Sequence, residues 1–501
     1  MSRHARLVLD PAFAVGPVDP RLFGSFVEHL GRCVYTGIYE PGHPAAGPDG
    51  LRTDVLALIR ELGVTVIRYP GGNFVSGYNW EDGVGPAGQR PLRLDPAWRS
   101  IETNEFGLRE FMSFLGELGP VEPMLAVNLG TRGVAEAVQL LEYANHPDGT
   151  ARSDLRISHG DKDPYGIRLW CLGNEMDGPW QIGHKSADDY GRLAAAAAWA
   201  MRLIDPGIQL VACGSSSQAM PTFGAWEATV LGHAYDLIDY VSMHAYYEEK
   251  DGDRDSFLAS AVDMESFIGD VAATCDHVAA RLKSKKKIGI SFDEWNVWYQ
   301  SKTADEPARD WATAPRLLED VYSVTDAVVV GSLLIALLRH ADRVHVACLA
   351  QLVNAIAPIM TEPGGPAWRQ TTFYPFALAS RYGRGRVLTA EPEGPTIRTA
   401  SHGDVPALHA TAVIDDRDET ITVFAVNRDR LAPLDLLTEF RGLRPAQVLE
   451  HRVLADADED ARNTAEHPDR VTPRSLDGMR ITEGSAHVVL PPMSWNMIRF
   501  A

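Results

Sequence analysis

Two short stretches of the sequence end an apolar run with a polar residue followed by a glutamate. They are Asn174-Glu175 and Asp293-Glu294, and the two glutamates are 119 positions apart (294 − 175). Two carboxyl groups about 5 Å apart can cleave a glycosidic bond with retention of configuration, whereas inverting pairs stand ~6.5–9.5 Å apart. The residue types therefore indicate glycoside cleavage, and the sequence leaves the distance between them open.

A single glutamate at the end of a strand is more often a structural or surface acid than a catalyst. Both of these glutamates have tryptophans nearby in the sequence, namely Trp170, Trp180, Trp295 and Trp298. The combination favours catalysis. Neighbouring residues of a regular strand point to opposite faces. Asn174 and Glu175 both reach a ligand only if the strand breaks there, and the alternation does not decide whether Asp293 or Glu294 points inward.

The overall charge narrows the class of ligand. The chain has 501 residues, with 47 Lys and Arg against 67 Asp and Glu, and a formal charge of −20. Such a charge repels nucleic acid and anionic lipid, and the short basic run at 283–287 does not offset it. No apolar run reaches the ~18 residues of a membrane span. We therefore expect neither a nucleic-acid nor a membrane partner, and a neutral or cationic ligand instead.

The N-terminus and the cysteines bear on the compartment. The apolar run after the basic N-terminus is far too short for a signal-peptide core. The five cysteines are scattered, at positions 33, 171, 213, 275 and 348. We interpret them as buried thiols of a reducing cytosol, since neither a CxxC spacing nor a nearby His pair indicates a metal. The sequence predicts a cytoplasmic protein without a metal or other cofactor.

Eight short apolar runs alternate with helical patterns between residues 21 and 383. The runs predict strands at 23–27, 64–69, 122–128, 167–174, 209–214, 239–244, 287–294 and 343–351. Helices are predicted between them, at 53–62, 107–118, 134–145, 186–204, 263–282 and 314–339. Eight such units indicate an α/β fold of the (β/α)8 TIM barrel type. An open doubly wound sheet is the alternative, but no GxGxxG follows the first strand.

After residue 383 the helical periodicity gives way to an alternation typical of strands. Runs at 408–414, 420–426, 487–490 and 495–500 predict a C-terminal antiparallel β-sandwich domain. A strand at residues 5–9 can join this domain from the other end of the chain. We therefore expect a catalytic barrel at 21–383 and a β-sandwich made of 1–20 and 384–501.

The predicted barrel strands end in hydrogen-bonding side chains. Active sites of such barrels lie at these ends, where the sequence places Glu28, Asn73, Asn174, Tyr246 and Gln351. Their chemistry suits an uncharged ligand rich in hydroxyl groups. We expect Arg68 to support the carboxylates and Trp298 to lie exposed at the mouth, and His244 is as easily a core imidazole as a catalyst. No local spacing supports a zinc site made of His29, His244 and Asp293.

Four motifs follow one another along the chain. They are FGSFVEHLGR at 23–32, RYPGGN at 68–73, GNEMDGPWQ at 173–181 and DEWNVW at 293–298. Together they resemble the intracellular α-L-arabinofuranosidases of glycoside hydrolase family 51. The resemblance covers essentially the whole chain, including PPMSWN at 491–496. It implies a (β/α)8 barrel of a retaining clan, with the acid/base after the fourth strand and the nucleophile after the seventh.

The resemblance also implies roles for individual residues. The acid/base corresponds to Glu175 and the nucleophile to Glu294. The sugar-binding residues correspond to Glu28, Asn73, Asn174, Tyr246 and Gln351. We expect a double-displacement enzyme that removes terminal non-reducing α-L-arabinofuranosyl residues from arabino-oligosaccharides derived from arabinan or arabinoxylan. The resemblance further suggests a homohexamer.

Two other functions remain open. A related retaining glycosidase, such as a β-xylosidase or an endoglucanase, would carry the same pair of carboxylates. A non-catalytic sugar-binding protein would keep the amide and aromatic residues but would not need both glutamates. The preferred linkage and leaving group do not follow from the sequence, and neither does carbohydrate binding by the β-sandwich.

Overall fold

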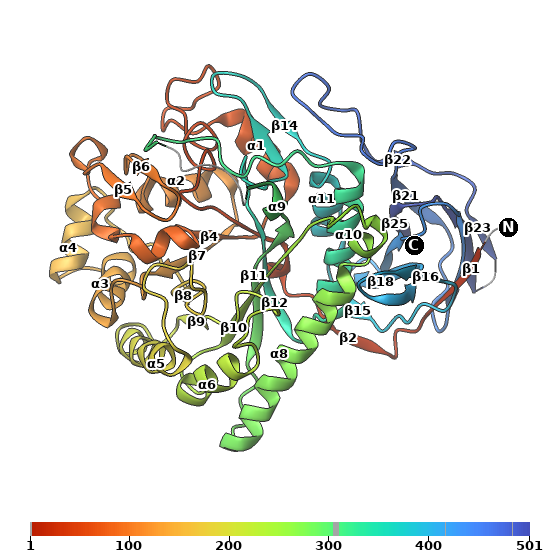
Figure 1. The fold of residues 1–501 in the computed structure, drawn as a ribbon, viewed down its shortest axis with the longest axis horizontal. Coiled ribbons are helices and arrows are strands. Elements are labelled where there is room, and N and C mark those ends of the chain that lie inside the picture. The colour runs from red at the N-terminus through yellow and green to blue at the C-terminus, as the bar shows by residue number, and fades with distance from the viewer. Residues whose placement is uncertain (1–2, 304–309, 416, 483) are drawn as a thin grey trace.

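The computed structural model describes residues 3–303, 310–415, 417–482 and 484–501. It shows a barrel surrounded by helices on one side and a group of sheets on the other, with the helices α10 (Val324–Arg339) and α11 (Phe373–Tyr382) between them (Figure 1). Both ends of the chain lie at the sheets (Figure 1).

Eight parallel strands close the barrel, and each corresponds to one of the predicted runs. They are β3 (Gly24–Phe26), β4 (Val66–Tyr69), β7 (Glu122–Val127), β8 (Leu169–Leu172), β9 (Gln209–Ala212), β10 (Tyr240–Tyr247), β11 (Gly289–Val297) and β12 (Val344–Ala350). Inward side chains such as Phe26, Met124, Leu169 and Val346 fill the interior with an apolar cluster. Because the interior is filled, ligands can bind only at an end of the barrel. The predicted TIM barrel is confirmed.

Helices follow the strands and cover the outside of the barrel. Besides α10 and α11 they are α1 (Thr53–Leu62), α2 (Leu108–Leu118), α3 (Val134–Asn145), α4 (Ala151–Ser158), α5 (Ala187–Ile204), α6 (Ala225–Ala234), α7 (Arg254–Leu258), α8 (Ala261–Leu282) and α9 (Gln300–Thr303). The start of α5 is as predicted, because the Ser186 hydroxyl accepts a bond from the Asp189 backbone N–H at 3.2 Å.

The helix predicted at 314–339 was placed too early in the chain. Helix α10 begins only at Val324. Ala314 and Leu318 have φ angles of 45° and 53°, which a right-handed helix does not allow. The Ser323 hydroxyl accepts a bond from the Asp326 backbone N–H and caps the actual start. The apolar pattern therefore continued past a helix boundary that backbone geometry sets.

Two sheets form the C-terminal part of the molecule. The larger contains, in spatial order, β2 (Ala14–Pro17), β15 (Arg386–Leu388), β18 (Leu408–Asp415), β19 (Thr420–Asn427), β25 (Ser494–Phe500), β21 (Val448–Leu454) and β22 (Arg474–Ser475). The smaller contains β1 (Arg3–Leu9), β20 (Leu434–Phe440), β24 (Ser485–Leu490) and β23 (Arg480–Thr482). Strand β1 pairs in parallel with β20, and the other pairs are antiparallel. A separate apolar core lies between the sheets and includes Leu7, Val423 and Leu436.

Three two-stranded hairpins lie in the connections outside the barrel and the two larger sheets. Strands β5 (Arg93–Asp95) and β6 (Ser100–Glu102) lie in the connection between β4 and α2. Strands β13 (Ile359–Thr361) and β14 (Ala367–Arg369) follow β12. Strands β16 (Thr396–Thr399) and β17 (Gly403–Pro406) lie between β15 and β18 of the larger sheet.

Helix α10 joins the barrel to the larger sheet. Trp495 of β25 packs so closely on the helix that a Cβ at Gly331 would lie 2.1 Å from the indole Cδ1. A side chain at this position would therefore force the two parts apart. Next to it, Ser332 Oγ lies 2.7 Å from His409 Nδ1, and His409 Nε2 lies 3.3 Å from Glu265 Oε1 of α8. The junction is a packed interface that contains a buried polar network.

Two further findings concern the cysteines and the helices. All five cysteines are buried free thiols, as predicted. Within residues 3–303, 310–415, 417–482 and 484–501, no helix is long and apolar enough to span a lipid bilayer.

Candidate active site

The fourth barrel strand ends in a break of the backbone. Strand β8 stops at Leu172, and the residues after it include Gly173 with a φ of 94° and Glu175 with a φ of 41°. Positive φ values interrupt the regular strand, so its alternation of faces no longer applies. Asn174 and Glu175 can therefore both face the barrel mouth, where both are buried.

The seventh strand reorients its acids with a bulge. Along β10 one residue separates Ser242 from His244, whereas two residues separate their partners Ser291 and Glu294 on β11. The same part of β11 also holds one residue more than its other neighbour, β12. A bulge bends a strand and re-aims its side chains. Both Asp293 and Glu294 make contacts inside the barrel mouth. The alternation of faces left open which of the two acids points inward, and in the structure both do.

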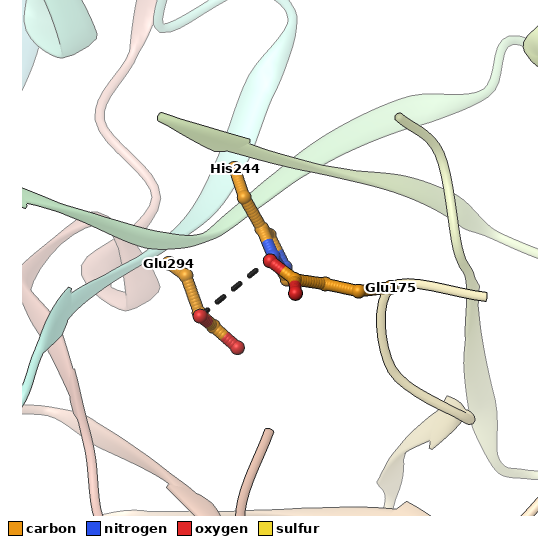
Figure 2. Close-up of side chains that lie close together, drawn as sticks. All are labelled: Glu175, His244 and Glu294. Atoms are coloured by element: carbon orange, nitrogen blue, oxygen red, sulfur yellow. Dashed lines mark hydrogen bonds and ion pairs between the residues drawn. The ribbon is translucent and has the colours of Figure 1, made fainter. Parts of the chain in front are cut away.

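Glu175 and Glu294 meet at His244. His244 Nδ1 lies 2.9 Å from Glu175 Oε1 and 3.7 Å from Glu294 Oε2. One carboxylate oxygen of Glu175 and one of Glu294 lie within 4.8 Å of each other. The two glutamates extend toward a common space from opposite sides (Figure 2). This separation fits the short spacing of retaining pairs and is below the ~6.5–9.5 Å of inverting pairs.

Glu294 is held at both oxygens. Arg68 Nη1 donates to Glu294 Oε1 at 2.6 Å, and the Tyr246 hydroxyl donates to Oε2 at 2.7 Å. Arg68 Nη2 also donates to Asn174 Oδ1 at 2.7 Å. Arg68 is buried and lies over the Phe26 ring, with its Cζ 4.8 Å from the ring centroid. These charge-assisted bonds fix the direction of the Glu294 carboxylate.

His244 bridges Glu175 and a buried aspartate. Its Nε2 lies 3.0 Å from Oδ1 of Asp293, which has no exposed surface. Burial alone disfavours the imidazolium, but the charge of Glu294 and the bonds to the other two carboxylates raise the His244 pKa to about 10. Burial also opposes ionisation of Asp293, whereas the charge of Arg68 and the bond from His244 lower the Asp293 pKa. His244 is thus a cation that donates at both ring nitrogens.

Glu175, His244 and Glu294 also have a spacing that a metal ion could use. A metal binds the lone pair of a neutral imidazole nitrogen. The imidazolium of His244 carries protons on both nitrogens and has no such lone pair. A metal ion at this position would have to displace a proton from His244, whose pKa is raised to about 10.

A cavity of about 420 Å³ opens above the carboxylates. Its wall includes Glu28, Asn73, Glu175, Tyr246, Glu294, Trp298 and Gln351. In the described part of the chain, Asn174 Nδ2 and Trp298 Nε1 are buried and have no hydrogen-bond partner. Buried donors of this kind call for a ligand acceptor. A Cβ at Gly72 would lie 3.0 Å from Glu294 Oε1 and 3.3 Å from Asn174 Nδ2, so glycine keeps this part of the cavity open.

Comparisons with known proteins agree with this geometry. Family models match residues 58–263 (alpha-L-arabinofuranosidase 1 domain) and 293–494 (alpha-L-arabinofuranosidase C-terminal domain). An intracellular exo-α-(1→5)-L-arabinofuranosidase of Streptomyces lividans is 69% identical over 501 residues, which are 100% of this chain and 76% of that protein. A solved family 51 α-L-arabinofuranosidase of Bifidobacterium longum covers 100% of both chains at 49% identity, with a TM-score of 0.96. The chain belongs to glycoside hydrolase family 51.

Membership of family 51 makes the chain a glycoside hydrolase and confirms the resemblance carried by the four motifs. Another relative, an exo-α-(1→6)-L-arabinofuranosidase of Bifidobacterium longum, is 56% identical over 99% of this chain and 97% of that protein. Members of the family are thus named for different linkages. The C-terminal family model begins at Asp293, inside barrel strand β11, so it includes part of the barrel mouth as well as the sheets.

In this family 51 enzyme Glu28 forms one wall of the cavity. Its Oε2 accepts a bond from Gln351 Nε2 at 3.1 Å. Its Oε1 accepts bonds from the Phe74 backbone N–H and from Trp98 Nε1, both at 2.9 Å. Burial and the nearby charge of Glu294 raise the Glu28 pKa to about 8. Near neutral pH this favours a protonated Glu28, which can donate a hydrogen bond to a ligand.

Two tryptophans contribute more than the sequence analysis assigned to them. Trp180 Nε1 donates to Glu175 Oε2 at 2.6 Å, although its side chain is 52% exposed. Trp98, which contacts Glu28 and lines the cavity, was not predicted at all. It lies in the β5–β6 hairpin of a long polar connection. The presence of a tryptophan in such a polar connection could have marked Trp98 as a candidate site residue. Nothing in the sequence linked it to Glu28.

Two of the polar strand ends support loops instead of the cavity. Asn128 Oδ1 accepts bonds from the backbone N–H groups of Gly130 and Thr131, both at 3.0 Å. The His29 ring is held between Glu102 Oε2 and the Tyr69 hydroxyl, at 2.9 and 2.8 Å. A polar residue at a strand end therefore predicts the correct end of the barrel, but not contact with the ligand.

Proposed function

We propose that this family 51 enzyme removes terminal non-reducing α-L-arabinofuranosyl residues from arabino-oligosaccharides with retention of configuration. The observation that carries the proposal is the separation of at most 4.8 Å between carboxylate oxygens of Glu175 and Glu294. It supports a covalent glycosyl-enzyme, because a water molecule does not fit between such a pair and the sugar. The alternative of a non-catalytic sugar-binding protein leaves this close pair of acids without a purpose.

In the first step Glu294 attacks the anomeric carbon while Glu175 donates its proton to the leaving oxygen. In the second step Glu175 takes a proton from a water molecule, and the water oxygen attacks the anomeric carbon. This breaks the bond to Glu294 and frees the sugar. The bonds from His244 and Trp180 to the Glu175 oxygens stabilise the carboxylate left after proton transfer.

The sugar ring would be held by the remaining groups of the cavity wall. Glu28, Asn73 and Gln351 lie on the side of the first, second and eighth strands. Asn174 Nδ2, which has no partner in the described residues, is available to a ring hydroxyl close to Glu294. Trp298 forms an edge-to-face pair with Tyr246, with ring centroids 5.0 Å apart, and closes the wall. Bonds that tighten as the oxocarbenium-like charge develops would lower the barrier.

The preferred linkage is proposed to be α-(1→5). The support is the 69% identity to a relative named for this linkage, against 56% to a relative named for α-(1→6). Hydrolysis of α-(1→5)-, α-(1→6)- and α-(1→3)-linked arabinobiose, followed by release of arabinose, measures the preference. Equal rates on all three linkages would contradict it.

Azide rescue tests both catalytic roles at once. In Glu175→Ala, azide should attack the glycosyl-enzyme and yield the azide with the configuration of the substrate. In Glu294→Ala it should attack the substrate directly and yield the opposite configuration. Glu175→Ala should also lose about 10²–10⁴-fold on oligosaccharides and far less on activated aryl glycosides. Identical azide configurations from the two variants would contradict the assignment, and Glu28→Ala serves as a control that keeps both acids.

Assembly and compartment complete the proposal. A homo-oligomer, with the hexamer suggested by the family resemblance, is supported by the exposed apolar side chains of Trp199 and Leu203 on α5, which are 59% and 65% exposed. A cytoplasmic location is supported by the relatives named as intracellular and by the five free thiols. Light scattering of the wild type and of Leu203→Glu tests the first point, and cell fractionation tests the second.

A further inference from the structure

A small cavity with many arginines lies where the N-terminal strand, the C-terminal sheets and helix α7 come together. Its volume is about 270 Å³. The wall is formed by the start of β1, by strand β16, by the connection from β19 to β20 and by the first turn of α7. No residue of this wall belongs to the wall of the catalytic cavity. We call this space the arginine cavity.

The wall of the arginine cavity has an excess of positive charge. Its charged residues are four arginines and two aspartates, namely Arg3, Arg398, Arg428, Arg430, Asp255 and Asp429. Four cations against two anions leave two positive charges in excess, although the whole chain has a formal charge of −20. A cavity lined by charges of one sign concentrates small ions of the opposite sign. The arginine cavity therefore attracts anions.

Two of these arginines already have carboxylate partners. Arg3 Nη1 lies 2.7 Å from Asp429 Oδ2. Arg430 Nη1 lies 3.8 Å from Asp255 Oδ1, and Arg430 Nη2 lies 2.7 Å from Glu459 Oε2. These ion pairs account for both aspartates of the wall. The other two arginines are left without a carboxylate there.

Arg428 is a buried cation, and the residue is only 2% exposed. Its Nη1 donates to the Pro406 carbonyl at 3.2 Å and its Nη2 to the Ser332 hydroxyl at 3.5 Å. Within the described residues, its Nε is buried without a hydrogen-bond partner. Burial, which the charge of Glu265 offsets only in part, lowers the Arg428 pKa to about 10. Because a buried charge is costly without a counter-charge, an anion in the cavity would stabilise this side chain.

Arg398 offers a second cation from the solvent side. It lies on β16 and is exposed. In the part of the chain that the structure describes, its guanidinium makes no hydrogen bond and no ion pair. A guanidinium presents a planar fork of donors that binds a phosphate or a carboxylate through two parallel hydrogen bonds. Arg398 can therefore bind an anion without giving up another contact.

The charge and the size of the arginine cavity favour a phosphate group. A phosphate monoester carries about −1.5 to −2 charges at pH 7, which matches the two positive charges in excess, whereas a carboxylate carries one. The volume of about 270 Å³ equals that of about nine water molecules at ~30 Å³ each, which leaves room for a small organic group on the phosphate. Ile397 and Leu431 add apolar surface to the wall for such a group.

We propose that the arginine cavity binds a phosphate group, either as inorganic phosphate or as the monoester of a small sugar. The inference goes beyond the proposed function, since none of the residues involved takes part in glycoside cleavage. The ligand would connect β1, β16 and the connection from β19 to β20 with helix α7 of the barrel. Its binding should therefore stabilise the folded chain.

Isothermal titration calorimetry of the full chain with inorganic phosphate and with ribose 5-phosphate tests the proposal. One phosphate group should bind per chain with a Kd of about 1 mM or lower, the affinity that two or three hydrogen bonds to charged groups give. Ribose, and sodium chloride at the same ionic strength, are the controls for the sugar and for screening. A lower Kd for ribose 5-phosphate would identify the monoester as the ligand, and otherwise the ligand is inorganic phosphate. No saturable binding of either would overturn the proposal.

Variants with opposite effects test whether the phosphate binds in the arginine cavity. Arg398→Ala removes an exposed cation and should raise the Kd by about tenfold. Asp255→Asn removes a negative charge from the wall and should lower the Kd by about threefold. Arg480→Ala, at an exposed arginine of β23 outside the cavity, is the matched control and should leave the Kd unchanged. An unchanged Kd in Arg398→Ala, or a higher Kd in Asp255→Asn, would overturn the proposal.

Hydrolysis of nitrophenyl α-L-arabinofuranoside separates this site from the catalytic cavity. The three variants should keep the wild-type kcat, because none of the changed residues lines the catalytic cavity. This result also shows that the variants are folded. Phosphate that inhibits hydrolysis competitively, with an inhibition constant equal to the calorimetric Kd, would place the bound phosphate in the catalytic cavity and overturn the proposal. The calorimetric result does not depend on hydrolysis, so failure of the proposed function would leave it standing.

Discussion

Two buried histidines of this molecule have opposite electrostatic surroundings. His244, at the barrel mouth, lies 2.9 Å from Glu175, 3.0 Å from Asp293 and 3.7 Å from Glu294. His409, at the junction between α10 and the larger sheet, has one carboxylate within reach, Glu265 at 3.3 Å. The pKa of His244 is raised to about 10, and burial, with the charge of Arg428, lowers that of His409 to about 4.

The difference teaches that burial alone does not decide the charge of a histidine. Both side chains are almost completely buried, and burial opposes the imidazolium in both. Around His244 three carboxylates outweigh the cost of burial and stabilise the imidazolium. Around His409 there is a single carboxylate, and nearby arginines add to the cost of burial, so the neutral imidazole is favoured. The cationic histidine belongs to the cluster that is proposed to do chemistry. The neutral histidine belongs to an interface between two parts of the fold.

The largest expected difference is in kcat, when one imidazole or the other is removed. His244→Gln should reduce kcat by about 10²–10³-fold, because two hydrogen bonds to charged groups are lost beside the acid/base. His409→Gln should leave kcat within about twofold, because His409 does not line the catalytic cavity. Steady-state kinetics on nitrophenyl α-L-arabinofuranoside measures both. Equal losses in the two variants would remove the functional distinction between the histidines.

Asp293→Asn weakens the charge on one side of His244 and leaves the side-chain shape nearly unchanged. Loss of a neighbouring negative charge should lower the His244 pKa by about 1–3 units, while Glu175 and Glu294 still face the ring. The alkaline limb of the pH profile of kcat should move to lower pH, and kcat at its optimum should fall by about tenfold. An alkaline limb that stays in place would show that Asp293 does not act through His244.

The two histidines should shift stability at opposite ends of the pH range. The folded pKa of His409, about 4, is below the unfolded value of about 6.5. Stability is therefore lost as pH falls from about 6.5 to 4, by about 3 kcal/mol. The folded pKa of His244 is above the unfolded value, so its contribution is present below pH ~6.5 and is lost as pH rises toward 10.

Urea unfolding of the wild type and of the two glutamine variants across pH tests these signs. His409→Gln should flatten the acid limb of stability, and His244→Gln should flatten the alkaline limb. Each variant is the control for the other, because both replace a buried imidazole by the same side chain. Changes on the same limb would show that one of the two environments is misassigned.

The smallest effect is expected for Ser332→Ala at the junction. The Ser332 hydroxyl lies 2.7 Å from His409 Nδ1, a short bond between a hydroxyl and a neutral imidazole. Its loss should lower the free energy of unfolding by about 1 kcal/mol and leave kcat unchanged. Urea unfolding and kinetics at the pH optimum measure the two quantities. A fall in kcat without a fall in stability would link the junction to the barrel mouth.

The sequence predicted the elements better than their boundaries. All eight barrel strands followed from short apolar runs with polar ends, because the alternation of strand and helix is a local property. The start of α10 did not follow, because the apolar pattern of residues 314–323 is compatible with a helix and only the positive φ angles of Ala314 and Leu318 exclude it. The parallel pairing of β1 with β20 spans more than 400 residues, and no local pattern specifies its direction.

For the site, residue chemistry identified the participants, and tertiary structure determined their arrangement. The sequence alone determined that Glu175 and Glu294 end the fourth and seventh strands, and that amides and tryptophans accompany them. It did not determine that Trp98 would reach Glu28, or that Asp293 would hold His244, because these contacts join elements far apart in the chain. Whether neighbouring residues both face the ligand depended on a left-handed residue after β8 and a bulge in β11. Only the packing of the closed barrel decides those two local departures from a regular strand.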